Sequence, residues 1–290
     1  MSCRVFFICY HIINLKSSKP EYTSLDKLDF EYDLPLWSGA SLEARATFFI
    51  PTRDNNSFYR ASKDYKGAQL YMLELNQSVL GGFNKTVLQY FHGSNANYSA
   101  FGTGNWLDYT GASNKAYRWT LINFGVVNFT ERFGMMHQIY GTVSGGYDNN
   151  LGSDNYTDKD SDKAFSLVVR PFYKLTKMTR LYLEAGFYTE SVKYKHANLD
   201  LLGNFYGSKT ENTQGQKYTL AYAITPDAGN FWSRPEIRFY VSYLHAKNGD
   251  LSSYGNQAVS GSGIVNGQYL NYTHFKNSET VFGIQAEAWW

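Results

Sequence analysis

Apolar and polar residues alternate along many short segments of this chain. In the segment that ends the sequence, one set is Phe282, Ile284, Ala286, Ala288 and Trp290, and the other is Gly283, Gln285, Glu287 and Trp289. Successive side chains of a β-strand point to opposite faces, so a period of two predicts a strand with one apolar and one polar face. The same alternation recurs at 41–48, 180–188 and 236–243. The pattern predicts an all-β, antiparallel fold.

The connections between the predicted strands alternate in length. The strands are predicted at 24–34, 40–50, 67–80, 86–93, 117–129, 135–147, 163–175, 180–194, 216–225, 236–246 and 280–290. Short connections fall at 35–39, 81–85, 130–134, 176–179 and 226–235, and long ones at 51–66, 94–116, 148–162, 195–215 and 247–279. Outer-membrane barrels have short periplasmic turns and long external loops. This alternation favours a transmembrane β-barrel over the alternative, a soluble sheet with one solvated face.

Composition agrees with a barrel and narrows the classes of function. The 290 residues include 25 Tyr, 20 Phe and 6 Trp, and aromatic residues favour strands. The mean hydropathy of −0.42 suits a barrel, because apolar residues facing lipid alternate with polar residues facing the lumen. A net charge of +2 gives no concentrated basic surface, so nucleic acid is excluded as a partner.

Residues that could carry catalysis or bind metal are scattered. Cys3 and Cys9 both lie near the start, so the rest of the chain contains no thiol ligand and no disulfide. The six histidines do not have the spacing of a metal site, and no Gly-x-Ser-x-Gly nucleophile motif is present. We therefore expect no catalytic residue, no metal and no cofactor. The alternative of a barrel enzyme would be revealed by hydrolysis that a histidine substitution abolishes.

Four segments resemble the maltoporins, which are carbohydrate-specific porins of the outer membrane. They are QSVLGGFNK at 77–85, VRPFYK at 169–174, FWSRPEIR at 231–238 and FGIQAEAWW at 282–290. Their order and spacing match, and the resemblance covers 22–290. It implies diffusion of maltodextrins or other oligosaccharides or glycosides through a homotrimeric pore in outer-membrane lipid. A relative that takes β-glucosides or sucrose fits these residues equally well.

The resemblance also implies particular sugar contacts. Sugar rings have apolar faces and hydroxyl edges, so a sugar pore needs aromatic rings together with charged or amide groups. Phe83, Trp232 and Trp289 match the aromatic track of maltoporins, and Asn84 matches a neighbouring polar contact. Alternation independently places Trp289 on the polar face. Phe83 and Trp232 fall at predicted short turns, where the alternative is a residue that anchors the barrel rim at the membrane interface.

The resemblance accounts for only part of the family's barrel. Maltoporins have eighteen strands, and about eleven are predicted here, so 22–290 is expected to be the C-terminal part of an incomplete barrel. Residues 1–21 do not match the family, and the apolar run at 5–13 lacks the cleavage site of a convincing signal peptide. An open sheet leaves unsatisfied backbone groups in hydrocarbon. A non-functional truncated porin remnant, which forms no maltodextrin-selective trimer by itself, is therefore the alternative to a working channel.

Overall fold

The described residues are almost entirely β-strands. The computed structural model describes residues 8–12, 24–52, 67–96, 114–147, 159–194, 198–199, 205–206, 208–247, 262–265, 268–271 and 278–288. The main strands are β1 (Ile8–Ile12), β2 (Ser24–Trp37), β3 (Ala40–Thr52), β4 (Ala68–Val79), β5 (Gly82–His92), β6 (Tyr117–Asn128), β7 (Phe133–Gly145), β8 (Lys159–Lys174), β9 (Thr179–Tyr194), β12 (Lys209–Ile224), β13 (Glu236–Lys247) and β16 (Ser278–Glu287). The short elements are β10 (Asn198–Leu199), β11 (Phe205–Tyr206), β14 (Ser262–Val265), β15 (Gln268–Asn271) and the 3₁₀ turn η2 (Gly93–Ala96). No helix in these ranges is long and apolar enough to cross a bilayer.

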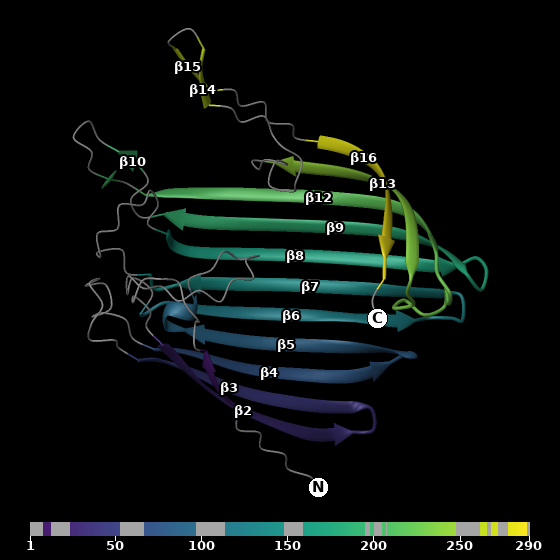
Figure 1. The fold of residues 1–290 in the computed structure, drawn as a ribbon, viewed down its shortest axis with the longest axis horizontal. Helices are drawn as coiled ribbons and strands as arrows, with labels where there is room; N and C mark the ends of the chain where they lie inside the picture. The colour runs from purple at the N-terminus through teal and green to yellow at the C-terminus, as the bar shows by residue number, and fades with distance from the viewer. Residues whose placement is uncertain are drawn as a thin grey trace. The chain divides into compact units, whose positions relative to one another are not determined.

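Twelve strands are hydrogen-bonded in the order β1-β2-β3-β4-β5-β6-β7-β8-β9-β12-β13-β16, and β10-β11 and β14-β15 form separate pairs (Figure 1). Successive strands of the main sheet are therefore neighbours, as in an up-and-down barrel wall. The registers from β1 to β5 and those of β12 with β13 and β13 with β16 are antiparallel. This confirms the all-β antiparallel prediction, and each of the eleven predicted strands is present. Sequence reasoning missed β1, which pairs with residues 25–29 of β2.

The chain divides into two compact units. Unit 1 comprises Met1–Gly125, Ile139–Phe165 and Glu190–Glu211. Unit 2 comprises Val126–Gln138, Ser166–Thr189 and Asn212–Trp290. Strands β6 to β9 and β12 contribute residues to both units.

In unit 1, strands β2 to β5 carry charges on one face and apolar groups on the other. Arg45 forms an ion pair with Glu31, and Lys85 pairs with Glu74 across β4 and β5. The opposite face carries a row of aromatic rings from neighbouring strands, namely Phe30, Phe48, Tyr71, Tyr90 and Trp119. The predicted alternation at 41–48 is thereby confirmed. We call the charged side of each strand its polar face and the other side its apolar face.

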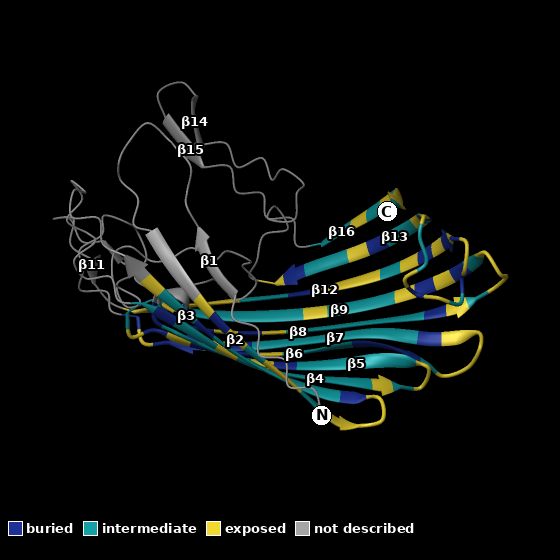
Figure 2. Ribbon diagram, turned by 60° about the horizontal axis from the view of Figure 1, so that its bottom comes forward, coloured by how far each residue is buried: buried dark blue, intermediate teal, exposed yellow. Residues whose placement is uncertain are grey.

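In unit 2, the same division runs through β9, β12, β13 and β16. Exposed residues of the apolar face are Leu181, Leu183, Phe187, Leu220, Tyr222, Ile237, Phe239, Phe282 and Ile284. Most of the intervening residues, among them Arg180, Glu184 and Glu236, are buried or half-buried on the polar face, and Figure 2 shows the resulting bands along the strands. The large exposed apolar surface suits a face that lies in lipid.

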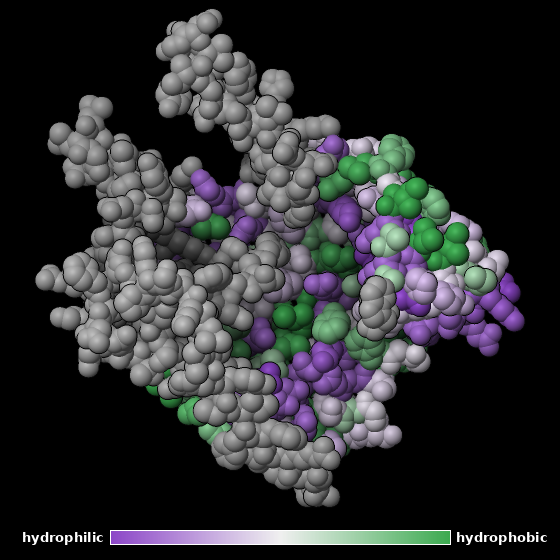
Figure 3. Space-filling model, viewed as in Figure 1, coloured by the Kyte–Doolittle hydropathy of each residue, from purple (hydrophilic) through white to green (hydrophobic). Residues whose placement is uncertain are grey.

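Three short turns of unit 2 lie side by side. The amide of Lys174 donates to the carbonyl of Arg132 over 2.8 Å, which joins the end of β8 to the β6–β7 turn. The amides of Thr225 and Ala228 each donate over 2.9 Å to the β8–β9 turn, at Met178 and Lys177. Figure 3 shows hydrophilic residues gathered at this end of the described strands. The turns therefore form one connected end of unit 2.

Candidate functional site

The turn between β12 and β13, residues 225–235, presents Trp232. Within the turn, the amide of Trp232 donates to Oδ1 of Asn230 over 2.9 Å, and the amide of Ser233 donates to the carbonyl of Asn230 over 3.1 Å. Trp232 is 46% exposed, and its ring centroid lies 5.2 Å from that of the buried Phe231. An exposed indole on a hydrogen-bonded turn is an ordered apolar platform.

Phe231 shows how this turn is oriented. Its ring contacts Phe172 of β8, with 5.7 Å between centroids, and Tyr182 of β9, with 6.1 Å. The guanidinium carbon of Arg170 lies 6.0 Å from the centroid of the same ring. Phe172, Tyr182 and Arg170 all belong to the polar faces of their strands. The turn is therefore folded back over the polar face and does not extend away from the strand ends.

A buried ion network lies beneath the turn. Arg180 and Glu236 form an ion pair in which both side chains are fully buried. The hydroxyl of Tyr182 donates to Oε2 of Glu236 over 2.8 Å, and Nε of Arg238 donates to Oε1 over 2.8 Å. Both carboxylate oxygens are thus satisfied by cationic or hydroxyl donors, which is the condition for burying such charges.

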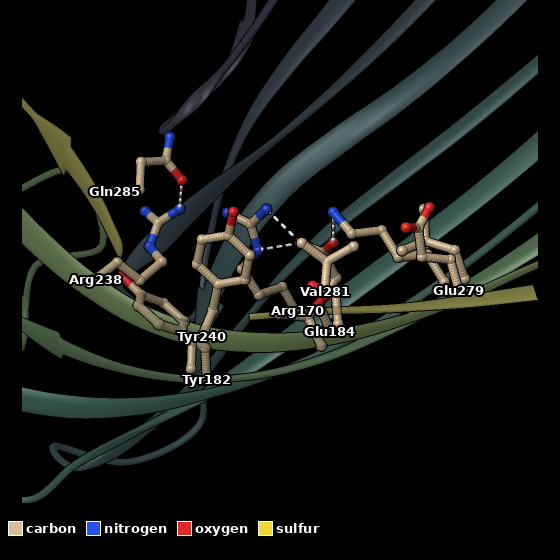
Figure 4. Close-up of a pocket in the computed structure, with 13 residues that line it drawn as sticks. Arg170, Tyr182, Glu184, Arg238, Tyr240, Glu279, Val281 and Gln285 are labelled. Atoms are coloured by element: carbon tan, nitrogen blue, oxygen red, sulfur yellow. Dashed lines mark hydrogen bonds and ion pairs between the residues drawn. The ribbon is translucent and has the colours of Figure 1, made fainter. Parts of the chain in front are cut away.

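A cavity of about 480 Å³ opens on the polar face of unit 2. Nε of Arg170 donates to Glu184 over 2.6 Å, and Nζ of Lys217 lies 3.1 Å from the other oxygen of the same carboxylate. Figure 4 shows Tyr182 and Tyr240 between this charged group and the Arg238–Gln285 hydrogen bond. Aromatic rings flanked by charged and amide groups match the apolar faces and hydroxyl edges of a polyhydroxylated ligand.

Gly283 makes room for one wall of this cavity. It lies directly opposite Tyr240 in the β13–β16 register. A Cβ at position 283 would lie 2.5 Å from the Tyr240 hydroxyl and 2.6 Å from its Cζ. The tyrosine ring therefore crosses the glycine, an arrangement in which an aromatic side chain covers a bare stretch of strand.

We expect Gly283→Ala to displace the Tyr240 ring and to cost about 1–3 kcal/mol of unfolding free energy, as overpacking does. Urea unfolding in lipid vesicles measures the cost. Gly141→Ala is the matched control, because nothing lies within 4 Å of its Cβ position, and it is expected to stay within about 1 kcal/mol of the parent. Equal effects of the two substitutions would contradict the assigned packing.

Phe83 and Asn84 lie in unit 1, at the start of β5. The sequence placed them in a connection at 81–85, but Leu80 and Gly81 alone make the turn, both with positive φ (45° and 66°). Such a two-residue turn lets strand pairing continue as far as Val79 and Gly82. Phe83 and Asn84 are therefore residues of strand β5 and not of a turn.

Their side chains belong to opposite faces of β5. The ring of Phe83, on the face that carries Lys85, makes an edge contact with Phe124 at 5.9 Å between centroids. Asn84 accepts a hydrogen bond from Nδ2 of Asn123 over 3.0 Å, and its own amide donates to Thr86 over 3.4 Å. Trp289 lies outside the described residues.

Sequence reasoning did not single out the cavity. Its wall includes Tyr182, Tyr240, Glu184 and Lys217. The only sequence signal for these residues was their place in the alternation of polar and apolar positions. Among the described residues, no three His, Cys, Asp or Glu side chains are grouped as a metal site requires.

Comparison with known proteins identifies the family. The family model described as LamB porin matches residues 11–290. The chain is 30% identical to "Maltoporin 1" of Klebsiella pneumoniae over 255 residues, which cover 88% of this chain and 51% of that protein. It is 31% identical to "Maltoporin" of Vibrio cholerae over 270 residues, with 89% and 56% covered, and 29% identical to "Maltoporin" of Photobacterium profundum, with 92% and 53% covered. The chain thus spans about half the length of the curated relatives that it matches. It belongs to the LamB porin family, whose members are outer-membrane porins.

Proposed function

We propose that the polar face forms the wall of a pore through which carbohydrates, maltodextrins or related sugars, diffuse across the outer membrane as part of a homotrimer. The observation that carries the proposal is the exposed Trp232 ring, on a turn folded over the polar face of the strands that also form the cavity. No catalytic step is part of this function.

The division of the strands into two faces supports a water-filled pore. Residues of the apolar face are exposed and suit contact with lipid, whereas ion pairs such as Arg45–Glu31 and Arg170–Glu184 stand on the polar face. Charges of both signs require water beside them or close partners. In outer-membrane barrels, the alternating polar residues point into the lumen.

Phe83, Asn84, Trp232 and Trp289 are the proposed sugar contacts. Phe83 is favoured by its position on the polar face of β5, where its ring packs against Phe124. Asn84 lies on the other face of β5 from Phe83 and is hydrogen-bonded to Asn123 and Thr86, so a sugar contact there requires its side chain to leave these partners and turn to the polar face. The assignment of Trp289 is supported by the resemblance to maltoporins and by the alternation of the last strand.

We expect Trp232→Ala and Phe83→Ala each to weaken maltohexaose binding about tenfold. This equals about 1.4 kcal/mol, in the range that one aromatic contact contributes. Calorimetric titration of the purified chain in detergent gives the affinity, and sugar block of the ion current in planar bilayers tests conduction. Trp119→Ala is the control, because Trp119 is similarly exposed, at 44%, but stands on the apolar face. Unchanged affinity in both polar-face variants would overturn the proposed function.

A further inference from the structure

Arg180 makes contacts well beyond its ion pair with Glu236. Its NH1 donates to the carbonyls of Asn230 over 2.6 Å and of Ala228 over 3.5 Å. Its NH2 donates to the carbonyl of Phe231 over 3.0 Å, and its Nε donates to Glu236 over 3.2 Å. One fully buried guanidinium on β9 therefore binds three carbonyls of the β12–β13 turn.

These contacts fix the peptide group that leads into Trp232. The carbonyl of Phe231 accepts from Arg180 and also from NH1 of Arg234 over 3.2 Å. The amide of Trp232, on the other side of the same peptide bond, is held by Oδ1 of Asn230. The carbonyl of Asn230 is also held by Arg180. A planar peptide with both polar groups bound has little freedom to rotate, so the direction in which Trp232 leaves the backbone is set.

Only arginine suits this position. Its five N–H donors form a rigid planar fork, whereas a lysine ammonium carries three donors at a single point. Lysine would keep the charge beside Glu236 but could not reach the carboxylate and the separate turn carbonyls together. The substitution Arg180→Lys therefore keeps the positive charge beside Glu236 but removes the contacts that position the turn.

We propose that Arg180 is a positioning residue for Trp232: by holding the turn carbonyls, it sets the direction of the indole that contacts the sugar. This rests on the proposed function of Trp232. Arg180 of β9 touches no sugar itself, but by positioning Trp232 it affects how well the pore binds sugar.

The test compares Arg180→Lys, Trp232→Ala and the double variant in the full chain. Deuterium exchange of the peptide covering 225–235 reports on the turn without any sugar, because the amides of Thr225, Asp227, Ala228, Gly229, Asn230, Trp232 and Ser233 are all hydrogen-bonded. We expect Arg180→Lys to speed this exchange at least about tenfold. We expect it to weaken maltohexaose binding about as much as Trp232→Ala does, and to have less than a twofold further effect once Trp232 is absent.

Arg118→Lys is the matched control, because Arg118 is another buried arginine, paired with Asp162 in unit 1. It is expected to change neither the exchange of 225–235 nor sugar binding. Unchanged exchange in Arg180→Lys overturns the proposal, and so does an equal loss of sugar affinity with and without Trp232. If Trp232→Ala alone leaves binding unchanged, the proposed function fails, and the exchange still decides whether Arg180 holds the turn. If Arg180→Lys does not fold, Arg180→Met combined with Glu236→Leu removes both buried charges, and exchange of the same peptide decides.

Discussion

Replacing Glu236 with alanine is expected to lower the unfolding free energy by about 3–5 kcal/mol, which is the usual cost of removing one partner of a buried ion pair. Arg180 is fully buried beside this carboxylate, and Arg238 and Tyr182 also donate to it. Without the carboxylate, Arg180 keeps its turn carbonyls but loses its counter-charge. A buried cation without an anion is destabilised strongly, because desolvation is no longer offset.

Urea titration of the chain in phospholipid vesicles, followed by tryptophan emission, measures this loss. Glu131→Gln is the control, since Glu131 is exposed in the β6–β7 turn, and it is expected to change stability by less than about 0.5 kcal/mol. A loss below about 1 kcal/mol for Glu236→Ala would mean that water reaches Arg180 in the native state.

Replacing Phe172 with alanine is expected to cost about 3–5 kcal/mol, as removal of a buried phenylalanine ring does elsewhere. Phe172 is 3% exposed and packs against Tyr182 and Phe231. Its ring also lies directly over Gly134 of β7, where no Cβ would fit. Alanine would leave a cavity that these strand and turn residues are poorly able to fill.

The same urea titration measures this effect, and Phe172→Leu is its control. Leucine keeps most of the volume and is expected to cost less than about 1.5 kcal/mol. Equal losses for leucine and alanine would show that ring volume is unimportant here. Because the ring supports Phe231, we also expect faster deuterium exchange of 225–235 in Phe172→Ala than in Phe172→Leu.

The strands and their faces were predictable because the two-residue alternation of side chains in a strand can be recognised from a short stretch of sequence. The pleat turns each successive side chain to the opposite face, so alternation in the sequence is alternation in space. This identified Arg238 and Tyr240 as residues of one face and Ile237 and Phe239 as residues of the other before any fold was known. It also placed Tyr182 and Glu184 on the polar face, without indicating that they share a cavity.

Strand ends were less predictable, so Phe83 was predicted in a connection although it lies in strand β5. Leucine is an unusual residue for a positive φ, so the segment around Leu80 and Gly81 gave little sign of a two-residue turn. Pairing with β4 determines where β5 begins, because hydrogen bonds between the two strands extend β5 back to Gly82. Phe83 and Asn84, adjacent in the sequence, consequently belong to opposite faces.

The sequence by itself determined that this protein is an antiparallel sheet with an apolar and a polar face, and its resemblance to maltoporins indicated Trp232 as a sugar contact. Only the tertiary structure decided how Trp232 is held. Arg180 and Glu236 are 56 residues apart, and the turn carbonyls that Arg180 binds carry no side-chain signature. A buried charge must find its partners among whichever strands and turns become neighbours, and a local pattern of residues does not contain that information.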